Sequence, residues 1–599
     1  MPHRATLITV VVALVGALAA PAAVRAASLV LPHVTVSPLD GTPDASATTQ
    51  ISFLGVPAAE LSSIVVHGSR SGGHGGKLEP YAAGGGASFV PLRAFTVGET
   101  VTVSATVAVS GQHGSVGTRF TVGSLVAVPG AAPPAPRPPA PAGTVASFVT
   151  QPTFHPPTVS VTTPAVDPAL GDVFLTPTNG PSQSGPMIVN PAGQLVWFSP
   201  EPAGTTATDL RVQQYLGQPV LTYWQGRVVL GHGVGAGVID SASYQQLAQV
   251  HAGNGLQMDL HDFDLEPNGV AYITVYEPVR WNLSSVHGPS SGIIEDCVVQ
   301  EIDVRTGLVM FEWHALGHVP LSASYSTPQP SSTAYWDWFH IDSVDVERDG
   351  NLLVSSRNTW TVYQIGHGYG EILWRLGGRY SSFKLGPNVH FAWQHNAVKL
   401  SDGSIEIFDN EDTPQIAPAS RGIDVTLDFN HHTATLLHQY VDAKQTVLAA
   451  SQGDVQPLSN ADHLLGWGQI GLVSEISAAG ALTFQLSLPT PVQSYRAYRF
   501  PWSAAPLTPP AVAATRPSGA TTTSVAASWN GATAVAAWQV LAGTTPSALA
   551  PVGGPVASTG FETPINAPTT APYVAVQALS ANGQVLATAN PAAATIPSG

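Results

Sequence analysis

Cysteine is nearly absent from this chain of 599 residues, which contains a single one, Cys297. A single cysteine excludes an intramolecular disulfide and a cysteine-rich metal site. We therefore interpret Cys297 as a buried apolar thiol rather than as a ligand or a nucleophile.

Charge is also scarce. Only 10% of the residues are charged, well below the usual ~25%. Acidic residues outnumber basic ones, and the formal net charge is −16. Nucleic acid and anionic membrane surfaces both call for basic patches, so neither is an expected partner. Hydrophobic residues make up 44% of the chain, which is ample material for several cores.

Long apolar runs are missing beyond the N-terminus. There, His3 and Arg4 precede an apolar stretch from Leu7 to Ala20. This stretch is shorter than the ~20 residues that span a bilayer. Small residues at 24 and 26 would permit cleavage after Ala26, so we predict a signal peptide at 1–26, secretion, and no membrane span.

Helical periodicity is hard to find. Between 146 and 505 the sequence instead repeats a short pattern, called here the repeated phrase. A glycine turn is followed by a short apolar strand with an aromatic or acidic end. The phrase occurs at 190–199, 266–277, 303–314, 347–358, 369–378, 401–411, 459–468 and 477–487. Many short strands with a repeated phrase predict an all-β fold with a six-bladed β-propeller core. A pair of β-sandwiches is the alternative.

Small β-sandwich domains are expected on both sides of this core. Alternating valines at 101–109 indicate an Ig-like domain over 27–127, and a Pro/Ala-rich linker follows at 128–145. Residues 506–599 resemble a fibronectin type III domain, with Trp529 and Trp538 as weak support.

Three histidines lie at nearly the same position in three of the expected blades, shortly before the turn of a repeated phrase. His261, His340 and His395 precede the glycine of the next turn by eight, ten and eight residues. Equivalent positions in successive blades would direct all three side chains toward one axis. Arg357 follows a D-G turn by seven residues and would return on the strand paired with that of His340.

The residue types in this cluster point to an anionic substrate. Three histidines alone would suit zinc or copper. A guanidinium is always charged, repels a cation, and matches a tetrahedral oxyanion. The cluster therefore predicts a site for a sulfate or phosphate ester, and we expect neither a metal nor a cofactor.

The runs MDLHDFDLEPNG, DWFHIDSVDVERDGNLLVSSRN, GEILWRLGG, FAWQHNA and SYRAYRFPW resemble the arylsulfotransferase family over about 150–505. The resemblance implies PAPS-independent transfer of a sulfuryl group from an aryl sulfate to a phenol, through a sulfated histidine. It implies His395 as the nucleophile, with His261, His340 and Arg357 in support. Asp342 departs from the family pattern, where an uncharged asparagine is expected.

Four tryptophans near these residues are candidates for stacking on aryl groups, although blade packing explains at least half of them. They are Trp336, Trp338, Trp360 and Trp393.

Other functions remain open at this point. A secreted, non-catalytic binding or adhesion protein would also use such modules. A hydrolase of aryl sulfates would use the same site with water as the acceptor. A quinoprotein dehydrogenase would require carboxylates around calcium, which the histidines and the arginine do not favour.

Overall fold

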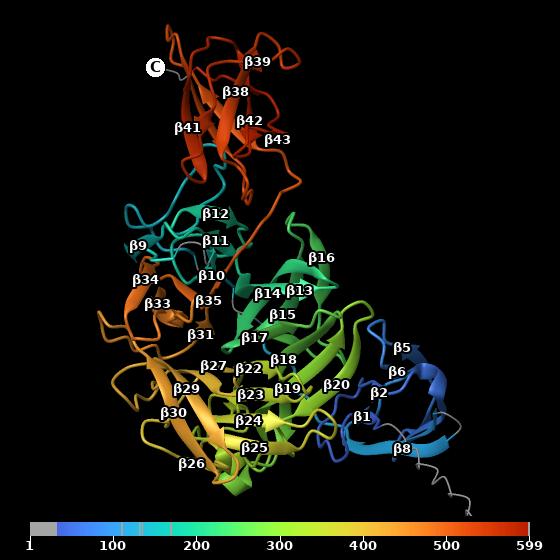
Figure 1. Ribbon diagram of the computed structural model, residues 1–599. Coiled ribbons are helices and arrows are strands. Elements are labelled where there is room, and N and C mark those ends of the chain that lie inside the picture. Colours follow the sequence, from blue (N-terminus) through green and yellow to red (C-terminus); the bar gives the residue numbers. More distant parts are fainter. Residues whose placement is uncertain (1–32, 110–111, 131–132, 135, 168–170, 597–599) are drawn as a thin grey trace, which may run out of the picture.

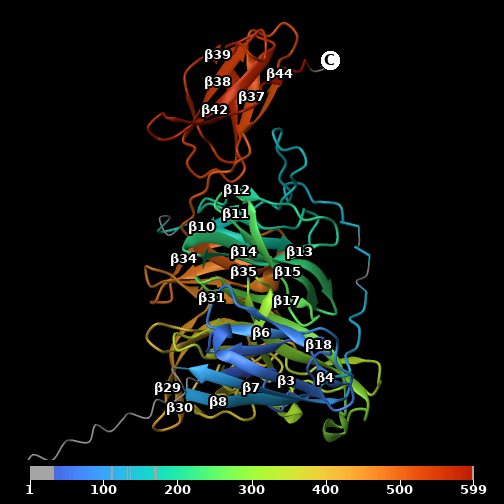
Figure 2. The same cartoon turned by 90° about the vertical axis from the view of Figure 1, so that its right-hand side faces the viewer.

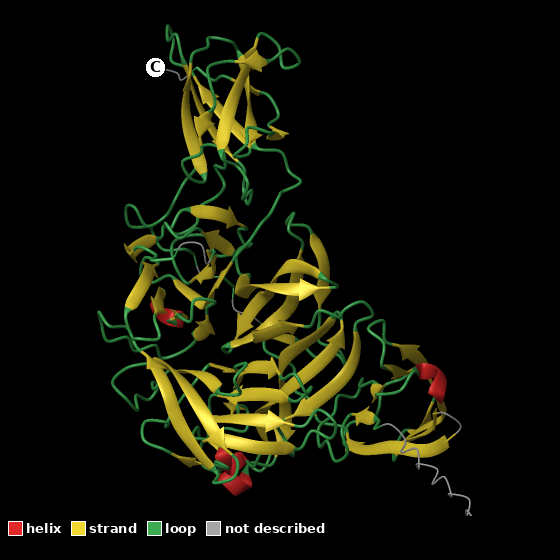
Figure 3. Ribbon diagram, viewed as in Figure 1, coloured by secondary structure: helices red, strands yellow, loops and turns green. Residues whose placement is uncertain are grey.

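The computed structural model describes residues 33–109, 112–130, 133–134, 136–167 and 171–596. Its regular structure is almost entirely strand (Figure 3), which confirms the all-β prediction. The short 3-10 helices have three residues each: η1 (Ala58–Glu60), η3 (Ser284–Val286), η4 (Leu321–Ala323) and η5 (Gly468–Ile470). Within the described ranges, no helix has the length and apolarity needed to cross a membrane. The predicted signal peptide lies outside these ranges.

An N-terminal unit consists of two four-stranded sheets with strand orders β1-β2-β6-β5 and β4-β3-β7-β8. The two sheets share one apolar core that includes Phe53, Phe89 and Phe120. Its strands are β1 (Thr35–Ser37), β2 (Ile51–Leu54), β3 (Leu61–Gly68), β4 (Gly72–His74), β5 (Gly76–Pro80), β6 (Gly86–Pro91), β7 (Thr100–Val109) and β8 (Gln112–Thr121). Strand β7 coincides with the alternating valines of the sequence.

A C-terminal unit also has two sheets, with strand orders β36-β37-β41 and β39-β38-β42-β43. Trp538 lies in its core and Trp529 packs against it. Its strands are β36 (Ala511–Thr515), β37 (Thr523–Ser528), β38 (Ala537–Gly543), β39 (Ala550–Pro551), β40 (Val556–Ala557), β41 (Glu562–Ala567), β42 (Tyr573–Leu579), β43 (Val585–Thr588) and β44 (Ala592–Ala593). The Ig-like and fibronectin-like types of the two units stay predictions.

A central region lies between these units (Figure 1) and is built from five antiparallel-rich sheets. Its strands are β9 (Ser160–Thr163), β10 (Asp172–Thr178), β11 (Met187–Val189), β12 (Leu195–Phe198), β13 (Thr206–Tyr215), β14 (Gln218–Val229), β15 (His232–Asp240), β16 (Gln246–Val250), β17 (Met258–Leu265), β18 (Val270–Trp281), β19 (Gly292–Asp303), β20 (Leu308–His314), β21 (Tyr335–Asp337), β22 (Ile341–Val346), β23 (Leu352–Ser356), β24 (Thr361–Ile365), β25 (Ile372–Gly377), β26 (Lys384–Leu385), β27 (Asn396–Lys399), β28 (Ile405–Asp409), β29 (Arg421–Asp428), β30 (Thr433–Tyr440), β31 (Asp454–Pro457), β32 (His463–Gly466), β33 (Leu472–Ile476), β34 (Leu482–Ser487) and β35 (Gln493–Phe500). Each of the eight repeated sequence phrases overlaps one of these strands.

Strands β13, β17, β22, β27, β31 and β35 are called the first strands, and each of them packs beside at least one other of the set. Strand β13 packs against β17, β17 against β22, and β22 against β27. Strand β35 packs against β13 and β31, and it also pairs with β10, so the two ends of the region meet in one sheet. The largest sheet contains two four-stranded groups, joined by the pairing of Gly235 with Met258.

Side-chain oxygens fasten these first strands to one another. Asp262 of β17 accepts a hydrogen bond from the backbone N–H of Val344 in β22, at 2.9 Å. Asp454 of β31 accepts one from Ala497 in β35, also at 2.9 Å. The same arrangement joins Ser343 to Ala397, Asp345 to Lys399, and Gln456 to Arg499. These bonds satisfy backbone donors that no neighbouring strand would reach, and they fix the strands that carry the histidines.

Candidate active site

The three predicted histidines lie within or immediately before neighbouring first strands. His261 stands within β17, where the pairing register with β18 shifts between Met258 and Phe263. His395 immediately precedes β27. His340 immediately precedes β22, and its φ is +56°. This left-handed conformation is uncommon outside glycine, and it ends the strand at the point where the side chain is needed.

All four predicted site residues come together. The ring centroid of His340 lies 5.0 Å from that of His261 and 6.5 Å from that of His395. The backbone N–H of Arg357 donates to the carbonyl oxygen of His340 at 2.8 Å, so the predicted hairpin does return the arginine beside this histidine. His340 is therefore the central member of the group.

A fourth histidine, which the sequence pattern did not single out, completes the cluster. The ring of His232 stacks on Tyr276 at 3.9 Å and lies 5.5 Å from His340. His232 opens β15 in a glycine-rich run, GHGVGAG, that has no resemblance to the positions of the other three. Burial alone would lower the pKa of His232, but its contact with Glu295 and the charge of Asp337 raise it to about 9. His232 is therefore a cation at neutral pH.

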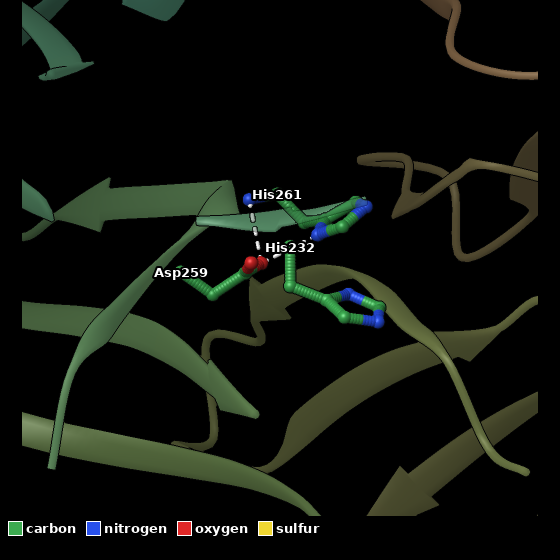
Figure 4. Close-up of side chains that lie close together, drawn as sticks. All are labelled: His232, Asp259 and His261. Atoms are coloured by element: carbon green, nitrogen blue, oxygen red, sulfur yellow. Dashed lines mark hydrogen bonds and ion pairs between the residues drawn. The ribbon is translucent and has the colours of Figure 1, made fainter. Parts of the chain in front are cut away.

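Carboxylates hold two of the histidines. Asp259 Oδ2 lies 2.5 Å from Nδ1 of His261 (Figure 4), and Asp337 is bonded to Nδ1 of His340. Although burial opposes it, the imidazole beside each carboxylate lowers the pKa of Asp259 and Asp337. An ionised carboxylate at Nδ1 orients the ring and leaves Nε2 for substrate. Burial lowers the pKa of His340 to about 4, against the effect of Asp337.

His395 has no carboxylate at Nδ1. This atom instead lies 2.8 Å from Oδ1 of Asn410 and 3.2 Å from the carbonyl oxygen of Trp393. The Asn410 amide nitrogen donates to the carbonyls of Ala449 and Gln452, which fixes its oxygen toward the histidine. Both neighbours of Nδ1 are acceptors, so Nδ1 carries the proton and Nε2 has the free lone pair.

The surroundings of His395 keep it neutral. Its side chain is only 3% exposed. Burial, and next the positive charge of Arg357, lower the pKa of His395 far below its ordinary value. Neither effect disturbs the lone pair on Nε2. A buried, unprotonated imidazole with a fixed tautomer is the form that attacks an electrophile.

Asp342 lies between the two histidines on this side of the site. Its Oδ1 is 3.4 Å from Nε2 of His340 and 3.7 Å from Nε2 of His395. The residue is fully buried, and neither of its oxygens has a hydrogen-bond partner among the described residues. Burial raises the pKa of Asp342 well above its usual range, so the side chain is a neutral acid. It therefore does not repel an anion.

Arg357 supplies the fixed positive charge. Its guanidinium lies over the ring of Trp393 at 4.9 Å and donates to Oδ1 of Asn358 at 3.0 Å and to the carbonyl oxygen of Ala450 at 3.4 Å. These contacts leave other N–H groups of the fork for a ligand. Trp360 packs edge-on against Trp393, so two of the four predicted tryptophans lie beside the arginine.

The other two tryptophans belong to the core. Trp336 and Trp338 are 4% and 0% exposed and pack in the largest apolar cluster. The expectation that packing explains at least half of the four is consistent with this arrangement. Cys297 is a free, buried thiol in the same cluster, as its apolar context predicted.

Several sets of ligand-type atoms overlap in the site. His232, Asp259 and His261 (Figure 4) bring one such atom each within 4.8 Å of the others, and His232 with Asp337 and His340 does the same. His261, His340 and Asp342 form a third set. The expectation that the site holds no metal stays a prediction.

The fold and the site define an all-β protein that gathers four histidines and an arginine in one buried centre. Residues 211–488, which include all of these side chains, match the family model described as Arylsulfotransferase (ASST). The resemblance noted in the sequence is confirmed, because this part of the chain matches the arylsulfotransferase family model. The match supports aryl sulfotransferase activity in general. No curated protein matches the chain in sequence.

Solved structures resemble the chain only distantly. A protein of unknown function from Bacteroides caccae is 14% identical, with 55% of this chain and 98% of that chain covered and a TM-score of 0.34. A virginiamycin B lyase from Staphylococcus aureus is 8% identical, with 56% and 88% covered and a TM-score of 0.27. A quinoprotein alcohol dehydrogenase-like protein from Bacteroides thetaiotaomicron is 9% identical, with 78% and 99% covered and a TM-score of 0.25. Likenesses this low assign no function.

Proposed function

We propose that the central region is a six-bladed propeller that carries a PAPS-independent aryl sulfate sulfotransferase site, in a protein secreted after removal of residues 1–26. The observation that carries the proposal is the state of His395, within the stretch that matches the family. This histidine is buried and unprotonated, its Nδ1–H is held by Asn410, and its Nε2 lone pair is free.

In the first half-reaction, Nε2 of His395 attacks the sulfur of an aryl sulfate. A bond between nitrogen and sulfur forms while the bond between sulfur and the aryl oxygen breaks, and the electron pair of that bond leaves on the phenolate. The Arg357 guanidinium binds the non-bridging oxygens, where a planar fork suits the tetrahedral geometry. The neutral form of Asp342 keeps a carboxylate charge away from the anionic donor.

His261 handles the proton. Its Nδ1–H donates to ionised Asp259, which orients the ring. In the proposed step His261 gives its Nε2 proton to the departing phenolate while Nδ1–H stays bonded to Asp259. We assign the acid/base role to His261 rather than to His340, because the low pKa of His340 leaves it without a second proton to donate.

The second half-reaction reverses these steps with a phenol as the acceptor. His261, now neutral, takes the phenol proton through Nε2. The phenol oxygen attacks the sulfur, and the bond between nitrogen and sulfur breaks to restore neutral His395. The first phenol leaves before the second enters the same place, so the kinetics are ping-pong.

Nitrophenol release tests the reaction class. Purified protein is given p-nitrophenyl sulfate with and without phenol. We expect release that requires the acceptor, loss of at least ~10³-fold in His395→Ala, and normal activity in His431→Ala, whose side chain is 78% exposed. Equal release without phenol would show a hydrolase. No release by well-folded protein would contradict the enzymatic proposal, and mass spectrometry of a donor-treated sample tests for sulfated His395.

Leaving groups of different basicity test the assignment of the proton donor. A phenolate that leaves easily needs little protonation, so a variant that lacks the acid loses less activity with p-nitrophenyl sulfate than with phenyl sulfate. We expect this difference in His261→Gln and not in His340→Gln. The opposite result would exchange the roles of these two histidines.

A further inference from the structure

A second cluster of charged groups lies between the N-terminal unit and the central region, away from the site described above. Figure 2 shows the sheets of the N-terminal unit against the strands of the central region. Hydrogen bonds from Ser46 and Thr48 to the carbonyl oxygen of Asn254, each 2.7 Å, fasten the contact. Ser52 donates across the same contact to the carbonyl oxygen of Val309 at 2.6 Å.

Strand register places three members of the cluster on one face of a sheet. Glu277 of β18 pairs directly with Asp296 of β19, and Val298, two residues on, pairs with His314 of β20. Residues two apart on a strand face the same way, so Glu277, Asp296 and His314 project together. Asp44, from the loop between β1 and β2, approaches from the N-terminal unit.

The four residues of the cluster are almost completely buried. Asp44 and Asp296 are 0% exposed, His314 1% and Glu277 3%. Neither oxygen of Glu277 has a hydrogen-bond partner among the described residues, and Asp44 has only its ion pair with His314 there. Buried carboxylates without partners cost several kcal/mol each unless a cation compensates them. Although burial opposes it, the charge of Asp44 and the contacts with Asp296, Asp44 and Glu312 raise the pKa of His314 well above its usual value, so one imidazolium faces several carboxyl groups. A divalent cation in place of the Nδ1 proton would compensate the carboxylates more fully.

The geometry fits a coordinated ion. Nδ1 of His314 lies 2.9 Å from Oδ2 of Asp296 and 3.2 Å from Oδ1 of Asp44. Ligands of a tetrahedral ion with bonds of ~2.0–2.2 Å are separated by ~3.3 Å. These atoms, one from each of the three residues, lie within 4.8 Å of one another. A small inward movement of side chains toward a shared ion is all that the site requires.

The other nitrogen of His314 has the partner that metal-binding histidines usually have. Nε2 lies 3.0 Å from Oε1 of Glu312. The second oxygen of Glu312 accepts from Asn254 at 2.9 Å and from Gln300 at 2.6 Å. A carboxylate that accepts Nε2–H fixes the tautomer and leaves Nδ1 for the metal. The hydrogen-bonded amides hold this carboxylate in turn.

We propose that Asp44, Asp296 and His314 bind a divalent transition-metal ion of the zinc type, which fastens the N-terminal unit to the central region. One imidazole with two carboxylates suits such an ion better than calcium or magnesium, which prefer oxygen ligands alone. Two carboxylates balance its charge once His314 has lost its Nδ1 proton to the solvent, and Glu277 projects from the same face of the sheet. The ion displaces the Nδ1 proton of His314, so its affinity rises with pH.

Zinc binding by the full chain tests this proposal. The protein is stripped with a chelator, titrated with Zn²⁺, and followed by bound metal per chain and by Tm. We expect one tightly bound ion per chain and a Tm that rises with added Zn²⁺. Asp44→Asn should weaken the affinity at least ~10-fold, while Asp40→Asn, an exposed change four residues earlier in the chain, should not.

The Tm of the wild type and of the variant, measured with and without Zn²⁺, is the second readout. Zn²⁺ should raise the Tm of the wild type, and Asp44→Asn should lose this gain. Without an ion, Asp44→Asn removes an ion-pair partner of His314 and should have the lower Tm. If Asp44→Asn does not fold, Glu312→Gln takes its place, with an affinity ~10-fold weaker expected. Absence of bound Zn²⁺ and of any Tm change in the wild type overturns the proposal. Equal affinity in the wild type and Asp44→Asn also overturns it.

Discussion

Nδ1 of His395 lies 2.8 Å from Oδ1 of Asn410, and the amide nitrogen of Asn410 is bonded to two backbone carbonyls. The amide therefore cannot flip, and the histidine keeps its proton on Nδ1. This relationship, rather than a carboxylate, sets the reactive nitrogen of the proposed nucleophile.

Replacing Asn410 tests this relationship. We expect Asn410→Ala to lower kcat/KM for p-nitrophenyl sulfate about 10- to 100-fold, because the buried N–H loses its main acceptor, at a cost of about 1–3 kcal/mol. Steady-state kinetics check the loss, and circular dichroism checks the fold. Asn430→Ala, an exposed turn position, is the matched control. Full activity in Asn410→Ala would show that another group fixes the tautomer.

The guanidinium of Arg357 is expected to stabilise charge on the sulfuryl oxygens. Arg357→Gln should lower kcat about 10²- to 10³-fold, the usual cost of losing one oxyanion donor. Arg357→Lys should recover only part of this, because an ammonium lacks the planar fork. The exposed Arg348→Gln is the control. A change confined to KM would assign Arg357 to donor binding alone.

Asp342 should tolerate an amide. Because burial keeps this side chain neutral, Asp342→Asn changes neither the charge nor the shape of the site, and we expect kcat/KM within about tenfold of the wild type. Asp337→Asn removes an ionised carboxylate from His340 and should be the more damaging of the two. A large fall in KM for the anionic donor in Asp342→Asn would mean that the native residue is charged.

His232 should make stability fall at alkaline pH. Its folded pKa of about 9 exceeds the ~6.5 of an unfolded histidine, so the folded state holds the extra proton. The resulting stabilisation is complete below pH ~6.5 and is lost as pH rises toward 9; its full size is about 3 kcal/mol. Urea unfolding at pH 6.5 and 9 should show a loss that is smaller in His232→Gln. An equal loss in both would place the effect elsewhere.

The sequence predicted the strands and most of the site residues, because both depend on patterns that span only a few positions. A D-G turn between apolar alternations specifies a hairpin, so Arg357 beside His340 followed from spacing alone. The similar spacing of His261, His340 and His395 from the next turn glycine indicated that the three side chains share one site. His232 had no such signal, because it lies in a glycine-rich run and reaches the site through the packing of β15 beside β17.

The sequence could not predict the protonation states of the site residues. Asp342 looked like an unhelpful charge in the motif, and its neutrality depends on full burial between two imidazoles. Asn410 follows β28, the strand paired with β27, and its amide oxygen is the acceptor for His395. No feature of the sequence around Asn410 indicates this role. A pKa depends on the solvent and charges around a group, and these exist only once distant segments have packed.

The sequence by itself determined the all-β class, the repeated phrase and the family resemblance, since turn residues and apolar alternation act over a few positions. Only the tertiary structure decided which histidine keeps a free lone pair and which carboxylates are charged. It alone also brought Asp44 to Asp296 and His314, because contacts between residues more than 200 positions apart depend on the packing of whole sheets.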